Sequence, residues 1–155
     1  MTPTELMARA IALSHEMVHA GGGPFGALIA RGGVIVAEGG NRVTLSRDPT
    51  AHAEIVAIRA ACTALGTFTL AGCEIYTSCE PCPMCLGAIY WARLDRIYFG
   101  NVRTDAARIG FDDAFLYREI LLPVEARAIP MVQMLHAEAI AAFDAWEANP
   151  DKVPY

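Results

Sequence analysis

A chain of 155 residues is long enough for one domain with a buried core, and 54% of its residues are hydrophobic. Its 12 basic and 17 acidic residues give a formal charge of −5, without the basic face or stripe that is typical of nucleic-acid binders. No apolar stretch reaches the roughly 18 to 20 residues of a membrane helix, and no basic segment leads into an apolar core at the N-terminus. We therefore expect a single cytoplasmic domain over residues 1–155 that acts on a small, uncharged molecule.

The first part of the chain predicts a helix followed by a β-hairpin. Thr2 and Glu5 have the spacing of a capping box, with a proline directly after Thr2, and an apolar stripe at helical spacing follows until a run of three glycines. Residues 25–30 and 34–38 are apolar and flank an Arg-Gly-Gly turn. This pattern indicates two strands joined by a tight turn.

The rest of the chain alternates between helices and strands. In chain order we expect a polar loop at 41–49, a helix at about 50–65, a strand at 74–78, a helix at 82–92, strands at 96–100 and 129–135, and a helix at 137–148. The last helix carries Phe143 and Trp146 on its apolar side. Elements of these lengths in this order predict an α/β fold, a three-layer αβα sandwich around a five-stranded mixed sheet.

Two short segments contain residue types that bind metals. His52 stands at the start of one predicted helix, and Cys82 and Cys85 stand in the first turn of the next. Cysteines three apart on a helix lie on the same face, and the positive end of the helix dipole favours the thiolate form that binds metals. Three protein ligands leave the fourth position of a tetrahedral zinc open to water, as in catalytic sites. We therefore predict one Zn²⁺ per subunit on His52, Cys82 and Cys85.

Glu54 follows His52 by two residues, close to the predicted metal without needing to bind it. A carboxylate at this position can transfer protons, so we predict that Glu54 is the catalytic acid/base. Cys-x-x-Cys alone also occurs in redox pairs and in structural zinc sites, and a structural site would need a fourth ligand, for which Cys79 is the nearest candidate. His-x-Glu combined with Pro-Cys-x-x-Cys is far more specific, because it is the signature of zinc deaminases.

With these motifs the chain resembles the cytidine-deaminase-like superfamily, and within it the bacterial guanine deaminases. The resemblance covers nearly the whole chain and rests on Asp-Pro-Thr-Ala-His-Ala-Glu at 48–54, Tyr-Thr-Ser-Cys-Glu-Pro-Cys-Pro-Met-Cys-Leu-Gly-Ala-Ile-Tyr-Trp-Ala at 76–92, Thr-Asp-Ala-Ala at 104–107, Ile-Gly-Phe-Asp-Asp at 109–113 and the terminal Tyr155. The metal motif indicates the superfamily, and the last two segments indicate the guanine branch. The resemblance implies a homodimer that hydrolyses guanine to xanthine and ammonia.

Several residues are candidate contacts to a purine base. They are the backbone amide of Ala53, the side chains of Asn41 and Asp113 as hydrogen-bonding groups, and the rings of Phe25, Trp91 and Phe111 as stacking surfaces. Each has an alternative interpretation: Asn41 as a turn residue, Asp113 as a helix cap, and the aromatic residues as part of the core. The resemblance favours the functional role for these side chains.

The segment 149–155 contains two prolines and ends in Tyr155. This composition indicates a stiff tail rather than a disordered one. We expect the tail to act as a lid that closes the active site, and the resemblance suggests that the site belongs to a neighbouring subunit, through an exchanged C-terminal segment.

Other functions compete with this interpretation. A tRNA adenosine deaminase would share the metal motif, but the last predicted helix is acidic and apolar, which makes RNA an unlikely partner. A cytosine or guanosine deaminase stays open, because the width of a pocket is not encoded in any motif. A protein that uses zinc only to hold two helices together is the non-enzymatic alternative.

Overall fold

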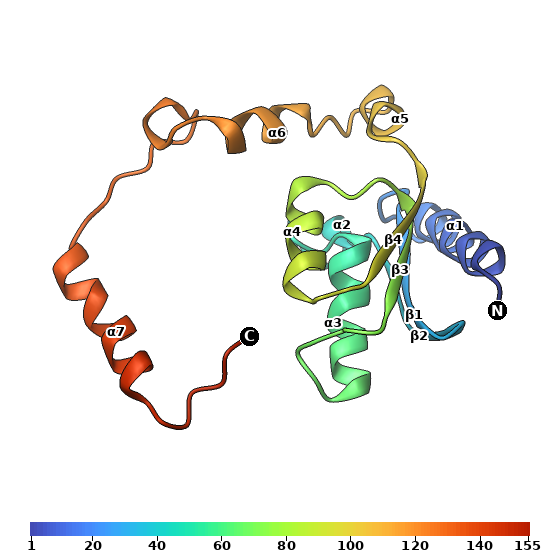
Figure 1. Ribbon diagram of the computed structural model, residues 1–155. Helices are drawn as coiled ribbons and strands as arrows, with labels where there is room; N and C mark the ends of the chain where they lie inside the picture. Colours follow the sequence, from blue (N-terminus) through green and yellow to red (C-terminus); the bar gives the residue numbers. More distant parts are fainter. The chain divides into compact units, whose positions relative to one another are not determined.

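The computed structural model describes residues 1–155, which form two compact units, Met1–Asp113 and Ala114–Tyr155. The first unit contains a four-stranded mixed sheet (Figure 1). Its strands are β1 (Gly26–Arg31), β2 (Val34–Gly40), β3 (Glu74–Cys79) and β4 (Arg96–Asn101), in the order β2-β1-β3-β4. β1 is antiparallel to β2 and to β3, whereas β3 and β4 are parallel. An α/β fold with a mixed sheet is therefore confirmed.

The predicted hairpin is present as β1 and β2. Gly32 and Gly33 form its turn with φ values of 56° and 78°. Two consecutive residues with positive φ are typical of the type I′ turn, which matches the twist of the flanking strands and favours glycine. The Gly-Gly pair therefore explains why the chain reverses here.

Helix α1 (Pro3–His19) covers one face of the sheet (Figure 1). Its apolar stripe of Leu6, Ala10 and Leu13 packs with Leu28 and Tyr76 of the strands. The predicted capping box is confirmed, because Thr2 Oγ1 accepts a hydrogen bond from Glu5 N and Glu5 Oε2 accepts one from Thr2 N. The cap defines where the helix begins, and the stripe defines which side faces the sheet.

Helices α3 (Ala53–Leu65) and α4 (Pro83–Trp91) cover the other face (Figure 1). Ala53, Ala57 and Ala61 lie one helical turn apart and are fully buried against the sheet. Small side chains at this spacing let the α3 backbone approach the strands closely. The first unit thus has three layers, helix, sheet and helices, as the sequence predicts.

The fifth strand that we expected at 129–135 is absent, so this prediction was wrong. The segment has no regular secondary structure, and Ile129, Val132 and Met134 are exposed. Pro130, the second residue of the segment, has no N–H to donate and restricts the residue before it, which disfavours pairing in a sheet. The apolar residues of this segment have no strand partner here.

The structure also contains short helices that the sequence analysis did not predict. They are α2 (Val43–Ser46), inside the expected polar loop, α5 (Arg103–Arg108), α6 (Ala114–Leu121) and a 3₁₀ turn at Val124–Ala126. The final helix α7 (His136–Ala148) confirms the one predicted at 137–148. None of the helices is both long and apolar enough to cross a membrane.

The close approach of α3 to the sheet predicts the effect of a single methyl group at Gly39. A Cβ atom there would lie 2.4 Å from the carbonyl oxygen of Ala53 and 2.6 Å from the amide nitrogen of Ala57, both backbone atoms that cannot move independently of the helix. We expect Gly39→Ala to lower the free energy of unfolding by about 2 kcal/mol, as measured by urea denaturation.

Gly87 in α4 supplies the matched control. A Cβ atom at Gly87 meets nothing within 4 Å in the chain. Gly87→Ala should therefore stabilise the protein by about 0.5 to 1 kcal/mol through the helix preference of alanine. Equal effects of the two substitutions would contradict the close packing of α3 on β2.

Candidate metal centre and active site

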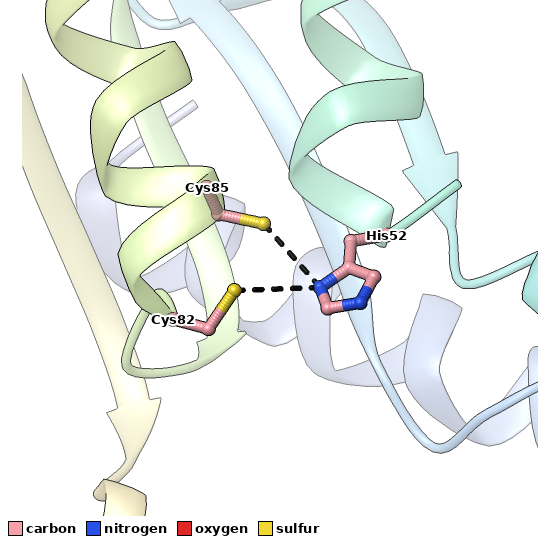
Figure 2. Close-up of side chains that lie close together, drawn as sticks. All are labelled: His52, Cys82 and Cys85. Atoms are coloured by element: carbon pink, nitrogen blue, oxygen red, sulfur yellow. Dashed lines mark hydrogen bonds between the residues drawn. The ribbon is translucent and has the colours of Figure 1, made fainter. Parts of the chain in front are cut away.

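The three predicted metal ligands come from the starts of two helices. His52 is the residue directly before α3, and Cys82 holds the same position before α4, with Cys85 in the first turn of that helix. Neither His52 nor Cys82 uses its side chain to cap its helix. Figure 2 shows all three side chains pointing toward one another. The fold thus brings together residues that are 30 positions apart in the chain.

The distances between the ligand atoms fit zinc. His52 Nδ1 lies 3.6 Å from Cys82 Sγ and 3.5 Å from Cys85 Sγ (Figure 2), and all three ligand atoms lie within 4.8 Å of one another. In a tetrahedral site with Zn–S of about 2.3 Å and Zn–N of about 2.0 to 2.1 Å, a nitrogen and a sulfur are about 3.6 Å apart. The residues therefore fit zinc without rearrangement, with Nδ1 as the nitrogen ligand.

The electrostatics of the two thiols favour a metal ligand. Hydrogen bonds from Cys85, and then from His52, lower the pKa of Cys82 to about 4, whereas the same pairing with Cys82 raises the pKa of Cys85. The hydrogen bond to Cys82 also raises the pKa of His52. One of the two sulfurs is thus a thiolate at neutral pH, which is the form that binds zinc.

Cys79 does not belong to the metal-binding group. It ends β3, is buried, and directs its sulfur toward the carbonyl oxygen of Val102 at 4.0 Å. Burial, followed by the charge of Glu54, raises the pKa of Cys79 to about 11, so it is a neutral thiol. With only three protein ligands, the site has the composition of a catalytic zinc centre rather than that of a structural one.

Glu54 lies in the first turn of α3, next to the three ligands. Its side chain is buried, with only 6% of the residue exposed. Burial raises the pKa of Glu54, and a hydrogen bond with Cys85 opposes this shift. Burial disfavours the charged form of this carboxyl group, so it takes up a proton more readily than an exposed carboxylate does, as suits a general acid/base.

Asn41 lies at the end of β2 and is almost fully buried. Its Oδ1 accepts a hydrogen bond from Val43 N at 3.2 Å, and its backbone N–H donates to Phe25 O. The turn role that the sequence suggested is therefore present. Its Nδ2 makes no hydrogen bond within the chain and is not sealed from solvent, so this N–H₂ group can also donate to a ligand.

Three further candidate contacts of the first unit are a pair of aromatic rings, a carboxyl group and a backbone amide. Phe25 and Phe111 pack edge to face, with ring centroids 5.0 Å apart. Asp113 is half-buried, and burial, followed by the negative charge of Cys82, raises its pKa. The amide N–H of Ala53 at the start of α3 has no acceptor within the chain.

Trp91 and Tyr155 are the remaining candidate contacts. Trp91 is the last residue of α4 and is 66% exposed, six residues and about 9 Å of helix beyond Cys85. Tyr155 ends the second unit and is 74% exposed. The roles of both residues in binding a base stay predictions.

Glu80 is a residue of the site region to which sequence reasoning gave no role. Its Oε2 accepts a hydrogen bond from the backbone N–H of Arg103, 23 residues along the chain. An acidic residue between a strand end and a proline before the metal ligands is the signal that could have drawn notice to it.

Comparison with known proteins places this site in a family. Residues 1–101 match the family described as the cytidine and deoxycytidylate deaminase zinc-binding region. The chain is 53% identical to the guanine deaminase of Bacillus subtilis, over the full length of both chains. It is also similar to the X-ray structure of guanine deaminase from Bacillus subtilis, with a TM-score of 0.97 and 52% identity over 100% of this chain and 99% of the other. A tRNA-specific adenosine deaminase of Agrobacterium fabrum is 48% identical over 50% of this chain and 51% of its own length.

The geometry predicts which cysteines hold the metal. We expect the wild-type protein to bind one zinc ion per chain, and Cys82→Ser to lose it, because a serine hydroxyl does not replace a thiolate in this site. Cys79→Ser is the matched control and should keep its zinc, because Cys79 lies outside the ligand group. Zinc content is measured by mass spectrometry of the metal after dialysis. Loss of zinc from the Cys79 variant would instead indicate a closed, structural site.

Proposed function

The chain belongs to the zinc-dependent cytidine and deoxycytidylate deaminase family, and we propose that it catalyses the hydrolysis of guanine to xanthine and ammonia. The observation that carries the proposal is a set of three zinc ligands next to a buried glutamate, in a chain that resembles a guanine deaminase over its full length. We infer that residues 1–155 act as one deaminase domain, and that this relative of a bacterial enzyme works in the cytoplasm.

His52, Cys82 and Cys85 are the zinc ligands in this proposal. Zinc, when bound, supplies Lewis-acid chemistry that makes water a nucleophile near neutral pH. The reaction exchanges the exocyclic amine of guanine at C2 for an oxygen atom from water, so one molecule of water is consumed and one of ammonia is released.

Glu54 moves the protons of this reaction. Its carboxylate accepts one proton from the attacking water and delivers it to a ring nitrogen, where it stays. It then takes the second proton of that water, from the oxygen now bound to C2, and delivers it to the amine, which departs as ammonia. The burial that raises the pKa of Glu54 favours the protonated carboxyl group between these steps. Because Glu54 serves in both transfers, its removal affects the reaction more than the loss of a single contact.

Three groups of the first unit can recognise the base. The amide N–H of Ala53 and the N–H₂ of Asn41 are donors without partners in the chain, and the carboxylate of Asp113 is an acceptor. Guanine offers oxygen and nitrogen acceptors to the first two groups and N–H donors to the third. The edge-to-face pair of Phe25 and Phe111 provides an aromatic surface for the flat ring.

The alternative functions are less well supported. Sequence similarity to tRNA-specific adenosine deaminases covers 50% of the chain for the Agrobacterium fabrum protein and 64% for the Bacillus subtilis one, against 100% for guanine deaminase, and α7 is acidic and apolar rather than basic. A structural zinc would not need a buried carboxyl group beside it. Hydrolysis of cytosine or guanosine would use the same metal chemistry, and the substrate test below separates these bases from guanine.

We also propose that the protein is a homodimer. No residue of the second unit, 114–155, is buried, and Leu121, Ile129, Val132, Met134 and Phe143 are all exposed. So many exposed apolar side chains on one short segment indicate a surface that another protein surface covers. Exchange of this segment between two subunits would cover these residues. It would also let Tyr155 reach the partner's site, and we propose that Trp91 of α4 reaches the partner's site as well.

The first test is the release of ammonia from guanine, guanosine, adenine and cytosine, each measured separately with zinc-loaded protein. We expect release from guanine alone. Glu54→Gln should bind zinc normally and lose about 10²- to 10⁴-fold in rate or more, because the amide cannot transfer protons. Glu16→Gln, on the exposed side of α1, is the control and should be unaffected.

Release of ammonia from another of the four would keep the metal chemistry but overturn the roles of Asn41 and Asp113. No release from any of them, with zinc bound, would contradict the proposed activity.

The tail is tested by deleting residues 150–155. If the tail closes the active site, the deletion should reduce turnover at least about tenfold with unchanged zinc content, since open sites admit water and release substrate. Co-expression of this variant with Glu54→Gln shows whose site the tail closes. Activity should return if the tail crosses to the partner, because one subunit then supplies the tail and the other supplies Glu54. Full activity of the deletion variant alone would refute the lid.

A further inference from the structure

Glu80 joins two parts of the active-site region that are far apart in sequence. It lies between the end of β3 and the segment with the ligand Cys82. Its backbone N–H donates to the carbonyl oxygen of Asn101 at 2.8 Å, and its side-chain Oε2 accepts from the N–H of Arg103 at 3.1 Å. One residue thus holds the chain on both sides of Val102, where β4 ends and α5 begins.

The short helix α5 is fixed at both of its ends. At its start, Glu80 accepts from the N–H of Arg103, and Asp105 Oδ2 accepts from the N–H of Val102 at 3.0 Å. At its end, Gly110 takes a φ of 97°, and Phe111 N donates to Ala106 O at 3.0 Å. This is a helix C-terminus closed by a left-handed glycine, so the direction of the chain after α5 depends on the helix before it.

The residues that follow α5 are those proposed to bind the base. Phe111 packs against Phe25. The charges that act on the half-buried carboxyl group of Asp113 come from Cys82, Arg103 and Glu80. Asp113 is thus the fifth residue after α5, in the segment whose start Glu80 anchors.

We propose that Glu80 is a positioning residue for the base-binding wall: by anchoring the start of α5 it sets the position of Phe111 and Asp113 relative to the zinc ligands. Glu80 touches neither the metal nor the substrate in this role. The inference rests on the proposed function, because it assigns the consequence of the anchor to the binding of guanine.

Two substitutions separate this role from a general effect on the fold. Glu80→Ala removes the acceptor for Arg103 N–H, whereas Glu80→Gln keeps an oxygen at the same distance along the side chain. We expect Glu80→Ala to raise the KM for guanine about tenfold with a smaller change in kcat and unchanged zinc content, because misplaced binding groups weaken substrate binding. Glu80→Gln should stay within about twofold of wild type. If both variants lose activity equally, or if zinc is lost, the positioning role is wrong.

A double-mutant cycle with Asp113→Ala tests whether Glu80 acts through the wall. If it does, Glu80→Ala should raise the KM by a smaller factor in a chain that already lacks the Asp113 carboxylate than in the wild type, because only the effect through Phe111 is left. Multiplying effects of the two substitutions would overturn the proposal.

Hydrogen exchange gives a readout that does not depend on the reaction. In Glu80→Ala the amides of residues 103–113 should exchange faster, while those of α3 stay as protected as in wild type. Unchanged exchange in residues 103–113 would refute the anchor. If these amides exchange faster in Glu80→Ala but the wild-type protein releases no ammonia from guanine, the anchor is confirmed and the proposed function is refuted.

Discussion

The whole arrangement depends on bringing the starts of two helices within reach of one metal ion. His52 before α3 and Cys82 before α4 must place their ligand atoms about 3.6 Å apart, and helices with large side chains on their inner faces could not pack so closely. The sequence meets this requirement with the alanines of α3 and with Gly39 beneath them. The hydrophobic packing of α3 therefore does more than stabilise the fold, because it sets the distance across the site.

The same geometry determines the electrostatics. Both helices direct their N-termini at the site, and the partial positive charge there favours the thiolate of Cys82. Glu54 shares the first turn of α3 but is surrounded by buried groups, so its pKa moves up while that of Cys82 moves down. The pKa values of two acids in one small site thus shift in opposite directions, because one acid is paired with hydrogen-bond donors and the other is desolvated.

The parts of this structure that could be predicted from sequence are those with local causes. The capping box, the Gly32-Gly33 turn and the spacing of Cys82 and Cys85 each specify a conformation within a few residues. The strand predicted at 129–135 is absent because an apolar segment does not by itself form a strand, and Pro130 disfavours pairing in a sheet.

The short helix α5 was missed because six residues are too few to show a periodic pattern. Glu80 could not be assigned from sequence either, since its contacts depend on the parallel pairing of β3 with β4, which places Cys79 opposite Asn101.

The charges of the site also bear on which base it binds. Two thiolates balance the charge of a zinc ion, so Asp113 is a further acidic group whose charge the metal does not balance. Its carboxyl group is partly desolvated and therefore requires hydrogen-bond donors. Guanine presents N–H groups next to the carbon that is attacked, whereas adenine presents an unprotonated ring nitrogen in the corresponding position. A carboxylate at this point accepts hydrogen bonds from guanine, whereas it would face and repel the nitrogen lone pair of adenine. A desolvated polar group that is left without a hydrogen bond costs more binding free energy than a small difference in ring shape, so this contact contributes most to the selectivity. The preference for guanine is thus expected to depend on the position of Asp113, and the position of Asp113 depends on the helix that Glu80 anchors.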